Sequence, residues 1–175
     1  MRATYTEIDL SAVAHNVRAI RSLVGPNPEI MAVVKANAYG HGAPGVSRAA
    51  LKSGASRLAL ALVQEAVELR EAGIEAPLLV FGEPYQDEAD LVISHRLTQV
   101  IFTIETARRL SQRAVSAGKS ALVHVKVDTG MNRVGVPAAH ALDFIRQVKS
   151  LEGIVIEGIY THFATADESD FSFTR

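Results

Sequence analysis

Short apolar runs alternate with amphipathic helical patterns along nearly the whole sequence, and this alternation limits the fold more than any other feature. The first helical pattern spans about Leu10–Leu23, where apolar residues recur at three- and four-residue spacing. A β-branched run at Ile30–Val34 follows, and it is typical of a strand that is buried on both faces. The other predicted strands are Leu58–Leu62, Leu78–Phe81, Gln99–Phe102, Leu122–Val127 and Ile154–Tyr160. The other predicted helices are Val46–Leu51, Gln64–Ala72, Tyr85–Ser94, Glu105–Ala117 and Ala138–Leu151.

This order of elements predicts right-handed βαβ units and a parallel sheet. A closed (β/α)8 barrel and an open doubly wound sheet both fit, but the sequence lacks the glycine motifs of nucleotide-binding open sheets. We therefore predict an α/β fold, a TIM-type (β/α)8 barrel that is incomplete because about six strands are present where eight close a barrel. Since an unclosed barrel leaves two raw sheet edges, we expect the natural polypeptide to continue past Arg175.

Composition excludes several classes of function. The formal charge is −1, and the basic residues are scattered, which argues against a nucleic-acid or anionic-membrane partner. The chain has no cysteine, so disulfides and thiolate chemistry are excluded. The six histidines are dispersed without the spacing of a metal-ligand set, and we predict no metal site. The N-terminus lacks a signal-peptide pattern and no apolar run approaches ~20 residues, so we expect a cytoplasmic protein.

The first cluster of polar residues is VVKANAYGHG, which begins at Val33. Lys35 directly ends an apolar run, where removal from water lowers the pKa of an ammonium group and favours the neutral amine that reacts with a carbonyl. The following turn offers the Tyr39 hydroxyl and the backbone amides of Gly40 and Gly42, a surface that could receive a phosphate. A surface lysine beside a glycine turn fits the same residues equally well.

The second cluster is HVKVDTGMNRVG, which begins at His124. Strand alternation places His124, Lys126 and Asp128 on one face. Because charges that face a barrel interior are costly unless paired, we expect Lys126 and Asp128 to pair with each other, or with Arg133 through the Asp128 carboxylate. Arg133 lies in the loop after the strand, where a guanidinium could bind a carboxylate or phenolate oxygen. A purely structural cluster of ion pairs explains the pattern at least as well.

The third cluster is YTHFATAD, which begins at Tyr160 and places His162 at the end of the sixth predicted strand. A histidine here could stack on a cofactor ring, although an isolated histidine at a strand end is more often structural. Functional residues of β/α barrels gather at the carboxyl ends of the strands. Three polar clusters at three such ends therefore predict a functional site.

VVKANAYGHG, VKVDTGMNRVG and THFATAD together resemble the motifs of the alanine racemase family of fold-type III pyridoxal phosphate enzymes. Their order and spacing agree with that family, and the likeness runs from about Ile8 onward. KAN is shared with related decarboxylases, whereas AYGHG and DTGMNR narrow the match to racemases. The resemblance implies a cytoplasmic, homodimeric enzyme that uses pyridoxal 5'-phosphate to interconvert L-alanine and D-alanine, supplying D-alanine for peptidoglycan.

The resemblance also implies roles for individual residues. Lys35 would form the covalent imine with the cofactor and act as acid or base on one face of the substrate α-carbon. Tyr39 would hydrogen-bond the cofactor phosphate, and His162 would lie against the pyridine ring. Arg133 would bind the phenolic oxygen of the cofactor and sit near the substrate carboxylate. Lys126 matches a position that is often carbamylated, giving a negative group that orients the arginine, although an ordinary ion pair would explain it as well.

The resemblance implies how the chain divides into segments and which part of the protein supplies each catalytic base. Residues 1–9 would be an extended segment that packs on a C-terminal β domain, and residues 10–175 would be the pyridoxal phosphate-binding barrel portion. The second base would be a tyrosine of that β domain, supplied by the partner subunit, so we expect residues 1–175 alone not to racemise efficiently. Two alternatives remain open: a single-domain barrel that binds pyridoxal phosphate as a carrier or homeostatic factor, and a fold-type III amino-acid decarboxylase.

Overall fold

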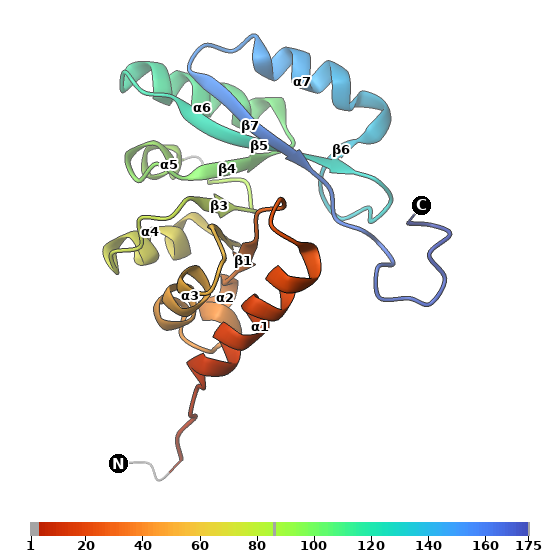
Figure 1. Ribbon diagram of the computed structural model, residues 1–175. Coiled ribbons are helices and arrows are strands. Elements are labelled where there is room, and N and C mark those ends of the chain that lie inside the picture. The colour runs from red at the N-terminus through yellow and green to blue at the C-terminus, as the bar shows by residue number, and fades with distance from the viewer. Residues whose placement is uncertain (1–3, 86, 175) are drawn as a thin grey trace. The chain divides into compact units, whose positions relative to one another are not determined.

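The computed structural model describes residues 4–85 and 87–174, and the chain divides into two compact units, Met1–Val80 and Phe81–Arg175 (Figure 1). Parts of three predicted segments lie outside the described residues. These parts are residues 1–3 of the extended segment 1–9, Gln86 in the predicted helix at Tyr85–Ser94, and Arg175 at the end of the predicted barrel portion.

The first unit contains three parallel strands joined through helices. Its elements are α1 (Leu10–Val24), β1 (Met31–Val33), α2 (Lys35–Tyr39), α3 (Ala43–Lys52), β2 (Arg57–Leu60), α4 (Val63–Glu71) and β3 (Leu78–Val80). Strand β2 lies between β1 and β3, with Val33 beside Ala59 and Leu60 beside Val80. Its core is formed by buried aliphatic residues of β2, α4 and β3: Leu58, Leu60, Val63, Leu69, Leu78 and Val80. Parallel pairing brings the carboxyl ends of β1 and β2 to the same edge of this sheet.

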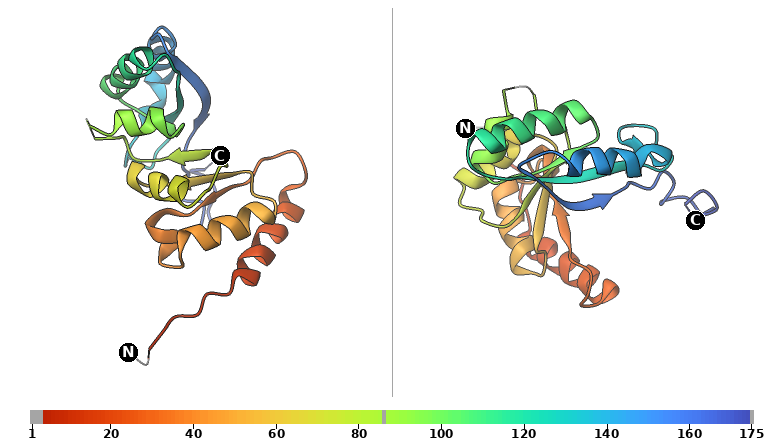
Figure 2. Two further views of the ribbon diagram at one scale, coloured as in Figure 1. Left: turned by 90° about the vertical axis from the view of Figure 1, so that its left-hand side faces the viewer. Right: turned by 90° about the horizontal axis from the view of Figure 1, so that it is seen from above.

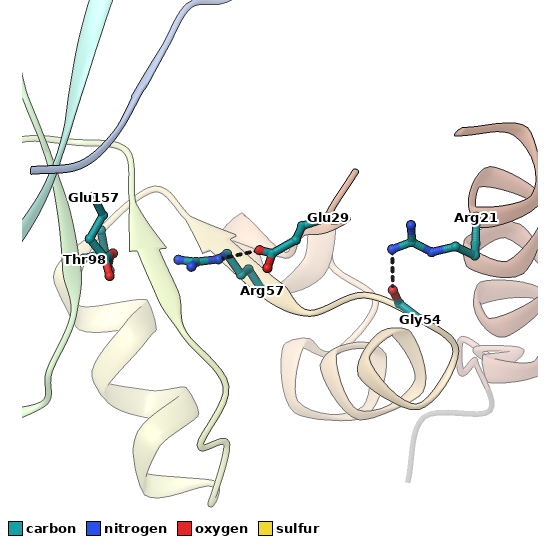
Figure 3. Close-up of polar contacts among 6 residues, drawn as sticks. All are labelled: Arg21, Glu29, Gly54, Arg57, Thr98 and Glu157. Carbon is teal, nitrogen blue, oxygen red and sulfur yellow. Dashed lines mark hydrogen bonds and ion pairs between the residues drawn. The ribbon is translucent and has the colours of Figure 1, made fainter. Parts of the chain in front are cut away.

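Helix α1 is defined by a cap at each end. The Asp9 carboxylate accepts hydrogen bonds from the Ser11 hydroxyl and amide, which lower the pKa of that carboxyl group. Gly25, at φ +78°, ends the helix. The Arg21 side chain donates to the Gly25 carbonyl at 2.9 Å and to the Gly54 carbonyl at 3.2 Å, which joins the end of α1 to the loop after α3 (Figure 3). Residues 4–9 lead away from α1 without helix or strand (Figure 2).

The second unit contains the longer strands. Its elements are α5 (Ala89–Ser94), β4 (Thr98–Ile101), α6 (Ile104–Ser116), β5 (Ala121–Asp128), β6 (Val136–Pro137), a 3-10 turn (Ala138–His140), α7 (Ala141–Lys149) and β7 (Ile154–Tyr160). Strand β5 pairs in parallel with β4 and with β7, and its last two residues pair with β6. Helices α6 and α7 contact each other and both contact β7 (Figure 1).

Polar side-chain contacts accompany the sheets of both units (Figure 3). Within the first unit, the Arg57 Nε lies 2.8 Å from a Glu29 carboxylate oxygen, which joins the start of β2 to the segment before β1. Within the second, the buried Thr98 hydroxyl donates to Glu157 at 2.9 Å and ties β4 to β7. These side chains join neighbouring segments within each unit.

All six predicted strands are present, with their ends shifted by at most two residues, but the prediction that the first is buried on both faces was wrong. Val33 of β1 is 40% exposed, because β2 is its strand neighbour on one side only within the described part of the first unit. Strand β7 also alternates between half-buried and exposed residues, with Val155 and Ile159 exposed.

The predicted helix at Tyr85–Ser94 was wrong at its start. Helix α5 begins at Ala89, because Tyr85 and Glu88 close a turn before it. The Glu88 amide donates to the Tyr85 carbonyl at 3.1 Å, and the Glu88 carboxylate accepts from the Tyr85 amide at 2.8 Å. Within residues 4–85 and 87–174, no helix is long and apolar enough to span a membrane.

Candidate functional site

Lys35 lies at the carboxyl end of β1, directly after the buried Val34. Its side chain is half-buried, and its Nζ lies 6.0 Å from the centroid of the Tyr39 ring. Among the residues that the structure describes, no carboxylate forms an ion pair with Lys35. The amine is therefore available to react with a carbonyl group or to carry a proton.

The turn after Lys35 has an unusual backbone. Four consecutive residues that are not glycine, Ala36 to Tyr39, have φ between +51° and +55°, so α2 is one turn of left-handed helix. Each such residue costs about 1–2 kcal/mol relative to the right-handed form. Strain of this kind persists only where the surroundings hold it, and it is concentrated at functional sites.

Hydrogen bonds within the turn hold this conformation. The amides of Gly40, His41 and Gly42 donate to the carbonyls of Ala36, Ala38 and Asn37 at 2.9, 3.1 and 2.9 Å. The expectation that the amides of Gly40 and Gly42 are free to receive a phosphate was therefore wrong, because the left-handed turn uses them. The Tyr39 side chain remains 60% exposed, and space lies open beside both glycines.

Lys126 is the central residue of the second unit's polar cluster. It is 4% exposed and lies beside Tyr160 in the register of β5 and β7. Burial lowers the pKa of the Lys126 ammonium, and the positive charge of Arg133 lowers it further, whereas Asp128 opposes the shift.

The expected ion pair of Asp128 with Lys126 or with Arg133 was wrong, because neither pair is formed among the described residues. Among the described residues, Lys126 has no carboxylate within ion-pair distance. The Asp128 carboxylate instead accepts hydrogen bonds from the Gly130 and Asn132 amides at 3.0 and 3.1 Å, and these bonds lower the pKa of its carboxyl group. Asp128 therefore folds the loop that carries Arg133.

Tyr160, at the end of β7, lies in this cluster. Its ring centroid lies 6.5 Å from that of His124 and 6.1 Å from that of Phe81. Burial raises the pKa of the Tyr160 hydroxyl to about 12, and the charge of Arg133 opposes this rise. Arg133 itself is exposed, and its charge influences both Lys126 and Tyr160.

Replacing Tyr160 with phenylalanine is expected to change the alkaline limit of stability. The folded-state pKa lies above the unfolded value of 10.0, so the folded protein holds the proton more tightly and wild-type stability falls between about pH 10 and pH 12. The variant should lose less stability over this interval, as measured by denaturant unfolding. Ultraviolet titration should lose its most alkaline tyrosine step in the variant, and persistence of that step would contradict the assignment.

His162 lies in the segment after β7 and is exposed. The neighbouring Thr161 hydroxyl lies 2.7 Å from the Thr129 hydroxyl, so the segment after β7 is tied to the loop after β5. This contact holds the chain that carries His162 beside the loop that leads to Arg133.

The structure brings together Lys35 with Tyr39 in the first unit and Lys126 with Arg133 in the second. Two further participants were not predicted from the sequence. Glu65 contacts the turn after Lys35, and its only sequence signal is an acidic residue in the first turn of a helix. The only sequence signal for Tyr160 was its position at the end of a predicted strand. Within the described residues, no group of three His, Asp or Glu side chains could hold a metal ion.

Sequence comparison places residues 8–175 on the family model "Alanine racemase, N-terminal domain". The chain is 49% identical over 172 residues to the alanine racemase of Desulforamulus reducens, which covers 98% of this chain and 46% of that protein. The chain thus spans about half the length of the curated relatives it matches.

Solved structures of amino-acid racemases also match this chain. An alanine racemase of Clostridium difficile 630 matches with a TM-score of 0.93 at 36% identity, covering 99% of this chain and 46% of that one. A histidine racemase from Leuconostoc mesenteroides matches with a TM-score of 0.88 at 32% identity, covering 95% of this chain and 45% of that one. These matches confirm the predicted α/β fold, an incomplete TIM-type barrel.

Proposed function

Because the chain belongs to the alanine racemase N-terminal domain family, we propose that it is the cofactor-binding portion of an alanine racemase that uses pyridoxal 5'-phosphate. The protein would interconvert L-alanine and D-alanine and so supply D-alanine for peptidoglycan. The observation that carries the proposal is Lys35, an amine without a carboxylate partner among the described residues, at a strand end and against a strained turn.

The residues of the first unit fit this cofactor. An aldehyde requires an amine, and Lys35 supplies one beside the exposed Tyr39. A phosphate requires a hydrogen-bond donor, and the Tyr39 hydroxyl supplies it next to glycines that leave open space. We assign Lys35 to the covalent link and Tyr39 to the phosphate. When bound, pyridoxal phosphate delocalises the negative charge left on the substrate α-carbon.

The protein's own groups then perform three tasks. The Lys35 amine would remove the α-proton from one face of the substrate in one direction of the reaction and supply it to that face in the other, a role commonly worth ~10²–10⁴ in rate. Arg133 would donate hydrogen bonds to the phenolic oxygen of the cofactor and bind near the substrate carboxylate. His162 would lie against the pyridine ring and limit its movement. Removal of the proton from one face and delivery to the other inverts the α-carbon.

Lys126 supports Arg133 in this proposal as a carbamate. Its buried amine has a lowered pKa, so a larger share is neutral and can attack carbon dioxide. A bond forms between the neutral Lys126 nitrogen and the carbon of carbon dioxide, one C–O π bond opens so that the charge rests on oxygen, and the nitrogen gives one proton to solvent. The product is an anion beside the positive charge of Arg133, where the structure has no ion pair for Lys126 among its described residues.

Wild-type protein in isotope-labelled carbon dioxide is expected to show one carbamate resonance that the Lys126→Ala variant lacks. Carbon NMR measures it directly. The matched control is Lys119→Ala, which removes an exposed lysine and should leave the resonance unchanged. A resonance that survives in Lys126→Ala, or none in the wild type, would rule out the carbamate.

The remaining family features complete the proposal. The protein would be a cytoplasmic homodimer, and its N-terminal segment would pack on a C-terminal β domain that also carries the second base. Residues 4–9 support this arrangement because they form no helix or strand and leave Tyr5 84% exposed, a segment suited to packing against another domain.

The test is incubation of the natural protein with pyridoxal phosphate and L-alanine in deuterated water. We expect D-alanine that carries deuterium at the α-carbon and no release of carbon dioxide. Carbon dioxide release would identify a decarboxylase, and cofactor binding without turnover would identify a carrier. L-histidine is a parallel substrate because a histidine racemase has a similar structure. Preferential formation of D-histidine would correct the substrate while keeping the reaction.

A further inference from the structure

Glu65 joins the turn after Lys35 to the loop after β2. One carboxylate oxygen, Oε1, accepts a hydrogen bond from the Ala36 amide at 2.5 Å. The other, Oε2, accepts from the amides of Ala61 and Leu62 at 2.8 and 3.1 Å. Glu65 lies in the first turn of α4, so the end of β2, the start of α4 and the turn after β1 meet at one side chain.

The two oxygens have different tasks. The bonds to Ala61 and Leu62 are local and cap the start of α4. The bond to Ala36 spans 29 residues and reaches the first residue of the left-handed turn. Among the described residues, Glu65 forms no ion pair with a cation, so its charge is directed at these three amides. Charge-assisted bonds of this kind are about twice as strong as neutral ones.

We infer that Glu65 is a positioning residue for Lys35. By holding the Ala36 amide, it fixes the peptide that directly follows Lys35 and keeps the turn left-handed, which places the Lys35 amine beside Tyr39. Its role toward the cofactor rests on the proposed function. Its role toward the turn does not, since the contacts are formed by the protein alone.

Glutamine at position 65 separates positioning from capping. Glutamine has one acceptor oxygen, whereas Glu65 uses two, so its amide group must face one set of donors. Orienting the oxygen toward Ala61 and Leu62 keeps two hydrogen bonds, and orienting it toward Ala36 keeps one. The Glu65→Gln variant should therefore keep the helix cap and release Ala36.

The matched control is Glu83→Gln in the second unit. Glu83 also accepts two adjacent backbone amides, those of Phe102 and Thr103, each at 2.8 Å. Both amides bond to the same oxygen, Oε1, so glutamine can keep them. Its second oxygen accepts from the Thr103 and Thr106 hydroxyls, and the Thr103 hydroxyl can rotate to accept from an amide group instead. This variant changes the same chemical group at a place where every donor belongs to the second unit.

The experiment has two readouts on the natural protein. The first is amide hydrogen exchange in the cofactor-free protein, where Glu65→Gln should raise the rate at Ala36 roughly tenfold, the effect of losing one charge-assisted hydrogen bond. The second is the fraction of Lys35 that borohydride traps with limiting pyridoxal phosphate. The apparent affinity for covalent attachment should fall by about the same factor. Glu83→Gln should change neither readout, and thermal unfolding should show both variants folded.

The outcomes separate the inference from the proposed function. Unchanged exchange at Ala36 and unchanged trapping in Glu65→Gln would overturn the inference, as would equal losses in both variants, which would indicate a general effect on stability. If the wild type does not link to the cofactor at Lys35, the proposed function fails. The exchange measurement needs no cofactor, and it still decides whether Glu65 holds the turn.

Discussion

Replacing Lys35 with alanine is expected to abolish covalent attachment of pyridoxal phosphate and to lower the racemisation rate by at least ~10²–10⁴-fold. The variant lacks both the amine that binds the aldehyde and the base on one face of the α-carbon. Cofactor absorbance after dialysis and polarimetry with L-alanine measure the two losses. The control is Lys52→Ala, which removes an exposed lysine of α3 in the same unit.

The fold of the Lys35→Ala variant should be retained. Lys35 is half-buried and forms no ion pair among the described residues, so its replacement should change the free energy of unfolding by about 0.5 kcal/mol or less. Loss of attachment together with a large loss of stability would indicate a structural lysine. Retained covalent attachment would contradict the assignment of Lys35.

Replacing Gly135 with alanine is expected to destabilise the second unit by about 2–4 kcal/mol. Gly135 has φ +130°, and a Cβ there would lie 2.8 Å from the Asp128 amide nitrogen and 3.1 Å from the Val127 carbonyl carbon. Both atoms belong to the backbone of β5 and cannot rotate away. Since β6 pairs with β5 immediately after this glycine, the clash should also displace the loop that carries Arg133.

Gly118→Ala separates steric clash from backbone strain. Gly118 also has a left-handed φ, +61°, but a Cβ there would meet nothing within 4 Å. Its replacement should cost only about 1–2 kcal/mol. Denaturant unfolding of both variants measures the difference. An equal loss in the two variants would show that the approach of Gly135 to β5 is not tight.

The sequence predicted the positions of the strands well, and their exposure and the backbone conformation of the turns less well. Apolar runs located the six strands that have three or more residues, because burial selects those residues directly, whereas the two-residue strand β6 (Val136–Pro137) was not predicted. The pattern could not reveal that β1 has a strand neighbour on one side only, which leaves Val33 exposed. It also could not predict the left-handed turn, since Ala36 and Tyr39 carry no signal for positive φ.

In the candidate site, too, the sequence located individual residues but not their contacts. Lys35 was located because a lysine directly after an apolar run is unusual. The ion pair expected for Lys126 was wrong, because the backbone amides of Gly130 and Asn132 occupy the Asp128 carboxylate. Glu65 was missed because its bond to Ala36 joins residues 29 positions apart and depends on tertiary structure.

Borohydride reduction of the natural protein with pyridoxal phosphate, followed by peptide mapping, tests the central claim most directly. We expect a single modified peptide that contains Lys35, since that amine lies at the strand end and has no carboxylate partner among the described residues. Modification spread over exposed lysines such as Lys52 and Lys119, with Lys35 unmodified, would contradict the claim.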